Sequence, residues 1–366
     1  TVKRKNIWWR LWIDNDKPRS YDTWKYLKKQ FRRLSRKSIR DKRLNKFRSL
    51  DHMFSLDQLP QFWNRLNRHL RAQPNTVLNT SDFARYYESI MCGSYVSPNP
   101  EVDESVRSKF LSSLNSHTNK TITSNDIDKL FKLLPFKSAP GIDGVTAEHF
   151  VHGNSTFLRQ HLASLCSVIF SYTIVPDVLK IGVISPILKK AGLNPNEPAN
   201  YRPITVCSVY SKLVELLITV PDKVSDNQFG FRAKRGTDFC NILLNDITAY
   251  YKANGSPIFV CSMDAEKCFD KIWHDGLFMK LWDSLEVTDW RLLYKWYKDM
   301  SAVVKWRHTL SNKFRMLRGT RQGSCLSPRF FNLFINDLLL QLEKADFGVR
   351  VGNVKINSFA YADDIN

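Results

Sequence analysis

Two acidic segments, far apart in the sequence, place the strongest constraint on how this chain folds. Asp264 follows the apolar run 258–263, which is typical of a buried strand whose tip reaches solvent. Asp363 and Asp364 follow Ala362, in a small-residue step that is typical of a hairpin turn. If the fold brings these segments together, their carboxylates form a hard oxygen site for Mg²⁺. Two such ions, about 3.5–4 Å apart, can clamp both reacting oxygens of an in-line phosphoryl displacement.

The charge of the chain indicates a polyanionic partner. It has 55 Lys and Arg against 35 Asp and Glu, a formal net charge of +20, which favours nucleic acid. Residues 1–50 hold 18 of the basic and 4 of the acidic residues, so they carry +14 of that charge. The N-terminal segment is therefore the predicted electrostatic contact.

Aromatic residues lie among these N-terminal cations. They either stack on bases or form the apolar stripe of an amphipathic helix, because Trp24, Leu27, Phe31 and Leu34 recur at helical spacing. Both interpretations leave the cations free to contact phosphate. The cations that we predict to do so are Lys28, Lys29, Arg32 and Arg33.

Cysteine content and hydropathy argue against several classes of protein. The seven cysteines contain no Cys-x-x-Cys pair, which argues against a disulfide framework and a zinc site and favours a reducing compartment inside the cell. The most apolar stretch, 162–179, contains serines, a proline and an aspartate, so it predicts a core helix and not a membrane span. At 366 residues with 43% hydrophobic content, the chain is long enough for two or three domains.

The first half of the chain contains a predicted connector and a predicted helix. The Pro, Ser and Asn-rich stretch 94–106 predicts a connector. The pattern of 124–134 predicts a helix that ends at Pro135, with Ser124 as its N-cap. Its apolar face consists of Ile127, Leu130, Phe131 and Leu134.

Two cations follow from predicted neighbouring strands. The run 181–188 predicts a strand that leads to Lys189, and the segment after a Pro and Asn loop carries Arg202. Arginine can grip a triphosphate as a bidentate fork and lysine as a point charge, but surface cations are more often simply solvated. The loop 318–328 leaves a similar choice: its glycines allow a nucleotide or template to approach the backbone, whereas a plain loop before a buried helix is the simpler interpretation.

The order of these motifs resembles the reverse transcriptase of non-LTR (LINE-type) retrotransposons. Any one motif is a common accident, but six in this order are not. They are SAPGIDG (138–144), SPILK (185–189) with NYRPI (200–204), QFGFR (228–232), MDAEKCFD (263–270), RQG (321–323) with SP (327–328), and YADD (361–364). The segments around Trp8, Trp9, Phe62 and Trp63 also resemble the linker that follows the endonuclease in such elements.

The resemblance implies an α+β fold: the fingers and palm of a right-hand polymerase, with an antiparallel palm sheet and helices, preceded by a basic helical N-terminal extension. The implied divisions are 1–95 for the extension, 96–122 for a connector, 123–250 for the fingers and 251–366 for the palm. We expect a fragment, because the chain starts at Thr1, stops just after Asp364 and shows no thumb. An upstream endonuclease in the same polyprotein is expected too.

The resemblance further implies copying of an RNA template into DNA, with a DNA primer or target, dNTPs and two Mg²⁺ ions that Mn²⁺ can replace. Asp264 and Asp363 are the implied metal ligands, and Asp364 is the third catalytic acid. Phe269 excludes a ribose 2′-hydroxyl by bulk. Lys189 and Arg202 hold the triphosphate, while Gln322 and Gly323 line the nucleotide pocket. The implied nucleic-acid contacts are Gln228, Gly230, Arg232 and Arg321.

The resemblance leaves two alternatives and one departure from the pattern. The chain could be a nucleic-acid-binding remnant of a decayed element, or a reverse transcriptase of the intron-maturase kind; the long basic linker with Trp pairs favours the retrotransposon. Cys268 replaces the usual alanine, a small-for-small change. A ribonucleoprotein found in nucleus and cytoplasm is implied, without a membrane partner. We expect little polymerisation by this chain alone, because the strand 354–361 has only Ile365 and Asn366 in which to turn back.

Overall fold

The computed structural model describes residues 76–366 except 117–119, 137, 191 and 353, together with scattered positions between Tyr26 and Leu44. The chain divides into two compact units, Thr1–Asn75 and Thr76–Asn366. In the first unit the described positions are helical, and Lys29, Arg32 and Arg33 are exposed. The predictions for Lys28, for Trp24 and its stripe partners Leu27 and Phe31, and for the two Trp-containing segments lie outside the described residues.

The second unit begins earlier than the predicted boundary at residue 95. Helix α4 (Thr80–Met91) belongs to it and buries Phe83, Tyr87 and Met91 in its core. The range predicted as a connector, 96–122, contains the helix α5 (Pro100–Ser113). Asn99 caps this helix and Pro100 stands in its first turn, where proline needs no hydrogen-bond donor.

The helix predicted near residue 124 is present as α6 (Ser124–Phe131). Its N-cap is Thr123, not Ser124, because Thr123 forms a capping box with Asp126. The apolar face is buried as predicted. The following helices are α7 (Ala147–His152), α8 (Thr156–Tyr172) and α9 (Asp177–Lys180). Among the described residues, no helix combines the length and apolar character needed to cross a bilayer.

The larger sheet carries the two predicted cations. Its strands follow the order β2–β1–β4–β5, and β6 also pairs with β4. The pair β1–β2 is antiparallel, whereas β1–β4 is parallel, so this sheet joins the predicted fingers range to the predicted palm range. The strands are β1 (Ile181–Leu188), β2 (Tyr201–Val206, after the 3₁₀ turn η1, Pro198–Asn200), β4 (Ser301–Trp306), β5 (Thr309–Leu310) and β6 (Phe314–Arg315).

The smaller sheet carries the acids. It consists of β3 (Met263–Asp264), β9 (Ala360–Tyr361) and β10 (Asp364–Ile365) in the antiparallel order β3–β10–β9. The hairpin therefore does close within the chain, contrary to the prediction that it lacks a partner strand, because β10 pairs on both sides. The range predicted as one strand, 354–361, is divided into β8 (Val354–Ile356) and β9. β8 pairs with β7 (Val349–Val351) in a second hairpin.

The apolar run before Asp264 is not a buried strand. Only its last residue, Met263, belongs to β3, and the side chain of Phe259 is 93% exposed. The run lines an apolar groove together with residues of α11 (Thr237–Ala253) and the 356–359 segment. Local hydrophobicity predicted a strand here, but the pairing that would bury it does not form.

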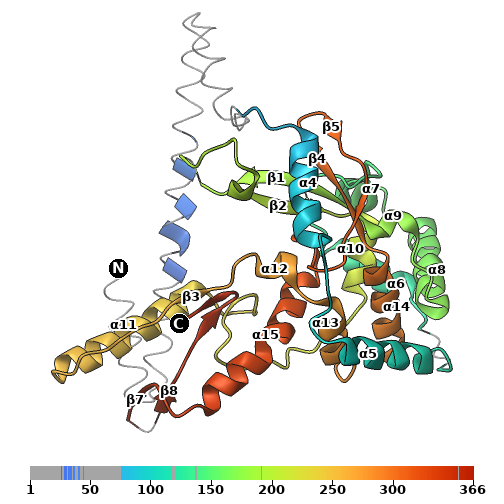
Figure 1. The fold of residues 1–366 in the computed structure, drawn as a ribbon. Coiled ribbons are helices and arrows are strands. Elements are labelled where there is room, and N and C mark those ends of the chain that lie inside the picture. Colours follow the sequence, from blue (N-terminus) through green and yellow to red (C-terminus); the bar gives the residue numbers. More distant parts are fainter. Residues whose placement is uncertain are drawn as a thin grey trace, which may run out of the picture. The chain divides into compact units, whose positions relative to one another are not determined.

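One hydrophobic core connects the helices to the larger sheet. It includes the fully buried rings of Phe83, Trp290, Trp296 and Phe330. Figure 1 shows α4 beside β1, β2 and β4. Leu339 of α15 (Ser327–Lys344) packs with Ala360 of β9 and Ile365 of β10. This arrangement confirms the predicted α+β class. The remaining helices are α10 (Val209–Leu216), α12 (Cys268–Lys271), α13 (His274–Leu281) and α14 (Val287–Lys298).

Candidate active site

The two acidic segments meet in the smaller sheet, as the sequence predicts. Asp264 in β3 lies directly opposite Asp364 in β10, and Asp363 precedes Asp364 in the hairpin turn. Directly opposed residues in an antiparallel pair place their side chains on the same face. The pKa of Asp364 is raised, first by burial and then by repulsion from Asp363 and Asp264. Clustered anionic oxygens that repel each other fit a hard divalent cation.

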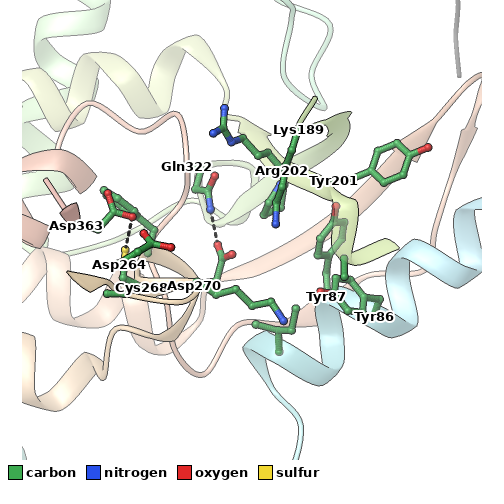
Figure 2. Close-up of a pocket in the computed structure, with 16 residues that line it drawn as sticks. Tyr86, Tyr87, Lys189, Tyr201, Arg202, Asp264, Cys268, Asp270, Gln322 and Asp363 are labelled. Carbon is green, nitrogen blue, oxygen red and sulfur yellow. Dashed lines mark hydrogen bonds between the residues drawn. The ribbon is translucent and has the colours of Figure 1, made fainter. Parts of the chain in front are cut away.

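Asp264 and Asp363 line a pocket of about 410 Å³, a volume suited to a small ligand (Figure 2). Asp364 is not among its lining residues. In the described part of the chain, no three carboxylate, imidazole or thiol groups converge tightly enough to form a complete metal site. The acids are thus neighbours on one small sheet without forming a complete three-ligand site in this structure.

Two cations that have no ion-pair partner among the described residues lie across this pocket from the acids. Arg202 in β2 pairs with Ile187 of β1, and Lys189 follows β1 with its backbone N–H bonded to Asn200 O at 2.9 Å. Both side chains are exposed, and neither lies within ion-pair distance of a carboxylate in the described residues. Figure 2 shows them on the β1–β2 side of Gln322, with Asp264 on the other side. A ligand with several negative charges would complete this arrangement.

The predicted gate, Phe269, is held firmly in the pocket wall. Its ring stacks on Phe331 with centroids 4.6 Å apart, and it meets the edge of Phe231 at 5.8 Å. Contacts with two rings restrict the rotamers of Phe269. A fixed aromatic ring beside the acids can exclude part of a ligand, such as a ribose 2′-hydroxyl, by its bulk.

Gln322 lines the pocket as predicted, but Gly323 does not. Gln322 Nε2 donates to Asp270 Oδ1 at 2.7 Å, and its backbone carbonyl accepts from Thr205 N at 2.7 Å. Gly323 has φ 134°, and a Cβ there would lie 2.4 Å from Thr205 O. Its glycine character serves close packing on β2, not access for a nucleotide.

Sequence reasoning missed several residues of the pocket. Asp270 is 5% exposed, and burial raises its pKa to about 6, although the hydrogen bond from Gln322 opposes the shift. Tyr86 and Tyr87 of α4 also line the wall, and Lys267 Nζ lies 5.3 Å from the centroid of the Tyr86 ring. Asp270 stands in the MDAEKCFD motif, so that signal was available. Nothing in α4 itself pointed to the pocket.

Arg321 does not contact nucleic acid, because it is buried at 2% exposure. Its guanidinium forms an ion pair with Glu215 Oε1 at 2.8 Å and donates to Leu179 O at 2.9 Å. Glu215 also accepts from Ser324 Oγ at 2.8 Å and from Cys325 N at 2.7 Å. Glu215 therefore ties down the loop that carries Gln322. A lone acid in the apolar stretch 209–220 was the overlooked signal.

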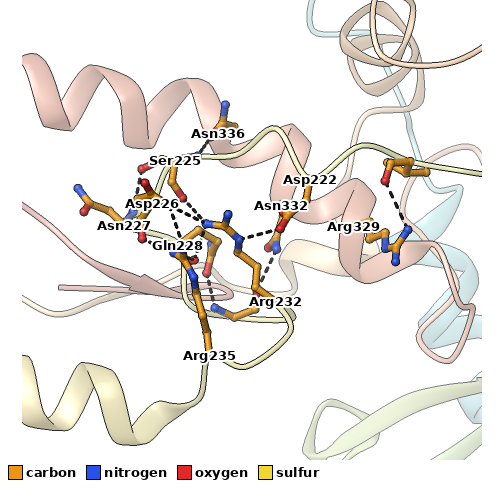
Figure 3. A network of polar contacts seen from close by, with 12 residues as sticks. Asp222, Ser225, Asp226, Asn227, Gln228, Arg232, Arg235, Arg329, Asn332 and Asn336 are labelled. Atoms are coloured by element: carbon orange, nitrogen blue, oxygen red, sulfur yellow. Dashed lines mark hydrogen bonds and ion pairs between the residues drawn. The ribbon is translucent and has the colours of Figure 1, made fainter. Parts of the chain in front are cut away.

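The other three predicted nucleic-acid contacts are also internal (Figure 3). The side chain of Gln228 is 0% exposed. Gly230 is buried, and a Cβ there would lie 2.2 Å from Ala362 N. The side chain of Arg232 is 10% exposed; its Nε donates to Asp222 Oδ2 at 3.1 Å, and its Nη1 donates to Ser225 O at 2.9 Å. The side chains of Gln228 and Arg232 thus make their hydrogen bonds within the chain, and Gly230 packs against the backbone of Ala362.

Cys268 makes a contact that alanine could not make. Its Sγ lies 3.4 Å from Asp363 Oδ2, so the thiol donates a weak hydrogen bond to a site acid. Burial and the charge of Asp363 raise the pKa of the Cys268 thiol. The residue therefore stays a neutral thiol beside the carboxylate.

An acid-bearing hairpin, a facing acidic strand and two exposed cations thus surround one pocket, an arrangement suited to nucleotidyl transfer. Residues 187–366 match the family model described as reverse transcriptase (RNA-dependent DNA polymerase). This match places a reverse transcriptase domain at residues 187–366, and the similar proteins below carry the names of transposon and mobile-element polymerases.

Similar proteins carry corresponding names. The "Probable RNA-directed DNA polymerase from transposon BS" of Drosophila melanogaster is 30% identical over 60% of this chain and 25% of its own length. The "Probable RNA-directed DNA polymerase from transposon X-element" of the same species is 31% identical over 44% of this chain and 19% of its own length. The "RNA-directed DNA polymerase from mobile element jockey" of Drosophila funebris is 26% identical over 67% of this chain and 27% of its own length. The chain thus spans about a quarter or less of these relatives.

Proposed function

We infer that this chain supplies the nucleotide-adding site of an RNA-directed DNA polymerase encoded by a retrotransposon. The observation that carries the proposal is one pocket lined by the acids Asp264 and Asp363 and by the exposed cations Lys189 and Arg202. In the proposed reaction, the 3′-hydroxyl oxygen of a DNA primer attacks the α-phosphorus of a dNTP. One P–O bond forms, the bond to pyrophosphate breaks, and an RNA template selects the base.

Reverse transcriptases generally depend on divalent metal ions, and the donors here fit such ions. We propose two Mg²⁺ ions held by Asp264 and Asp363, with Asp364 beside them; Mn²⁺ can replace Mg²⁺. The ions would supply charge neutralisation at the attacking and leaving oxygens. Lys189 and Arg202 grip the triphosphate, Gln322 contacts the nucleotide, and Phe269 blocks a 2′-hydroxyl. The seven free cysteines fit the proposed setting, a ribonucleoprotein of nucleus and cytoplasm.

The direct test is primer extension on an RNA template by the complete protein that contains this chain. We expect DNA synthesis that requires template, dNTPs and Mg²⁺, and that stops when EDTA is added. Tight RNA binding without any extension would instead identify a nucleic-acid-binding remnant. The finding of an endonuclease encoded just upstream would separate a retrotransposon enzyme from an intron maturase.

Replacing Phe269 with alanine should relax the choice of sugar. The ring is held between Phe331 and Phe231 and lines the pocket, so its removal opens space for the 2′-hydroxyl. We expect the ratio of ribonucleotide to deoxyribonucleotide incorporation to rise about tenfold or more, judged from kcat/KM for matched nucleotide pairs. Phe269→Tyr keeps the bulk and serves as the control. An unchanged ratio in Phe269→Ala would assign the gate to another residue.

Neutralising the N-terminal cations should weaken the salt dependence of RNA binding. If Lys28, Lys29, Arg32 and Arg33 each contact one phosphate, changing all four to Gln lowers the slope of log K against log salt by roughly 3 on single-stranded RNA. The measurement is a salt titration of affinity for the parent and the variant. The control changes four exposed cations of the second unit to Gln: Lys190, Lys223, Lys234 and Lys305. Equal slopes for parent and N-terminal variant would contradict the prediction.

A further inference from the structure

The hairpin turn that carries the site acids is gripped by one buried amide. Gln228 Oε1 accepts hydrogen bonds from Ala362 N at 2.9 Å and from Gly230 N at 2.8 Å. Its Nε2 donates to Ala362 O at 3.2 Å. The amide thus satisfies both backbone groups of Ala362, the residue immediately before Asp363. A side chain with 0% exposure that makes three such bonds is fully committed to the turn.

Backbone contacts around Gln228 extend this grip to the strand before the turn. Phe229 N donates to Ala360 O at 2.8 Å, and Ala360 N donates to Asn227 O at 2.8 Å. Gln228 and Ala360 form a parallel bridge, so the segment acts as a fourth, short strand at the edge of the acid sheet. Gly230 permits the approach, since any Cβ there would meet the Ala362 backbone.

The Gln228 segment is itself anchored to α15. Asn332 Nδ2 donates to Gly230 O at 2.9 Å, and Ser225 N donates to Asn336 Oδ1 at 2.7 Å. Arg232 and Arg235 brace the loop from within through the carbonyl groups of Ser225, Asp226 and Gln228 (Figure 3). The turn is therefore connected to a long, well-packed helix and does not rest on the short strands alone.

The turn needs this support for two physical reasons. Ala362 has φ 60°, a left-handed conformation that a residue with a Cβ adopts only at an energetic cost. Asp363 and Asp364 also repel each other and Asp264, which favours separation of the strands before a cation binds. A two-residue strand on each side supplies few bonds to resist both effects.

We propose that Gln228 is a positioning residue for the metal site. This proposal rests on the proposed function only for the identity of the ions that the acids bind. Gln228 sets the backbone of Ala362 and thereby the place of the Asp363 carboxylate. Loss of the hydrogen bonds made by its side-chain amide should let the turn relax, so that Asp363 and Asp264 bind a divalent cation less tightly. RNA binding should not change, because Gln228 is not exposed.

The first variant, Gln228→Met, keeps the side-chain volume and removes all three hydrogen bonds. The second, Gln228→Glu, keeps the oxygen that accepts from Ala362 N and Gly230 N but loses the N–H that donates to Ala362 O. Asn227→Ala is the matched control. Asn227 accepts the hydrogen bond from Ala360 N through its backbone carbonyl, so the substitution keeps this contact. Mn²⁺ binding is measured by electron paramagnetic resonance on the complete protein, beside RNA affinity and thermal unfolding. Changes in groups that orient metal ligands typically weaken metal binding about 10–100-fold.

We expect Mn²⁺ affinity to fall about tenfold or more in Gln228→Met and less in Gln228→Glu, with RNA affinity retained and Asn227→Ala unchanged. The Mg²⁺ concentration for half-maximal extension should rise in parallel. Parental Mn²⁺ affinity in a folded Gln228→Met or Gln228→Glu protein would overturn the inference, as would a selective loss of RNA affinity. If the parent binds Mn²⁺ but does not extend primers, the polymerase proposal fails while this inference remains testable.

Discussion

Asp264→Asn and Asp363→Asn should each abolish nucleotide addition while RNA affinity stays near that of the parent. Each change removes one of the proposed anionic metal ligands from a site where three carboxylates are neighbours. The loss of charge stabilisation at the reacting oxygens is worth several kcal/mol, which corresponds to a rate reduction of about a thousandfold or more. Single-nucleotide extension rates and RNA affinities, measured on the same preparations, test both parts of the expectation.

Glu104→Gln is the matched control for these acid-to-amide changes. Its carboxylate is 69% exposed on α5 and it makes only a long contact with Arg107 at 4.0 Å. It should extend primers at the parental rate. Extension near that rate in Asp264→Asn or Asp363→Asn would contradict the assignment of these acids as metal ligands, whereas a joint loss of extension and RNA affinity would point to a damaged fold.

The second large effect concerns stability. Glu215→Ala should lower the free energy of unfolding by about 3–5 kcal/mol, because it leaves the buried Arg321 guanidinium without its counter-charge. It also removes the acceptor for Ser324 Oγ and Cys325 N. Denaturant unfolding of parent and variant measures the difference.

Two comparisons make this stability prediction specific. Lys132→Ala breaks an exposed ion pair with Asp128, which lies 2.7 Å away on α6, and should change stability by at most about 1 kcal/mol. The double change Glu215→Met with Arg321→Met removes both buried charges, so it should recover a large part of the loss. A Glu215→Ala protein as stable as the parent would show that the ion pair does not hold the loop.

Local sequence was sufficient for elements whose pattern repeats over a few residues. The strand 181–188 lies where its apolar run predicts. Three of the four predicted apolar residues are buried on α6, and the fourth, Leu134, is buried just after the helix ends. The order of the acids and of the RQG loop also indicated the site, because the order of several such motifs is far more specific than any one of them. Local pattern failed at 258–262, where an apolar run lacks the strand partners that would bury it.

The sequence by itself indicated acids, cations and an aromatic residue that the structure places around one pocket, because their types and order carry the signal. Their roles in catalysis stay predictions. Only the tertiary structure decided which polar motif residues face the pocket and which support it. Gln228 binds Ala362 and Arg321 binds Glu215, each across more than a hundred positions of sequence. A buried amide or guanidinium must find a partner, and which one it finds depends on contacts between distant segments that no local pattern encodes.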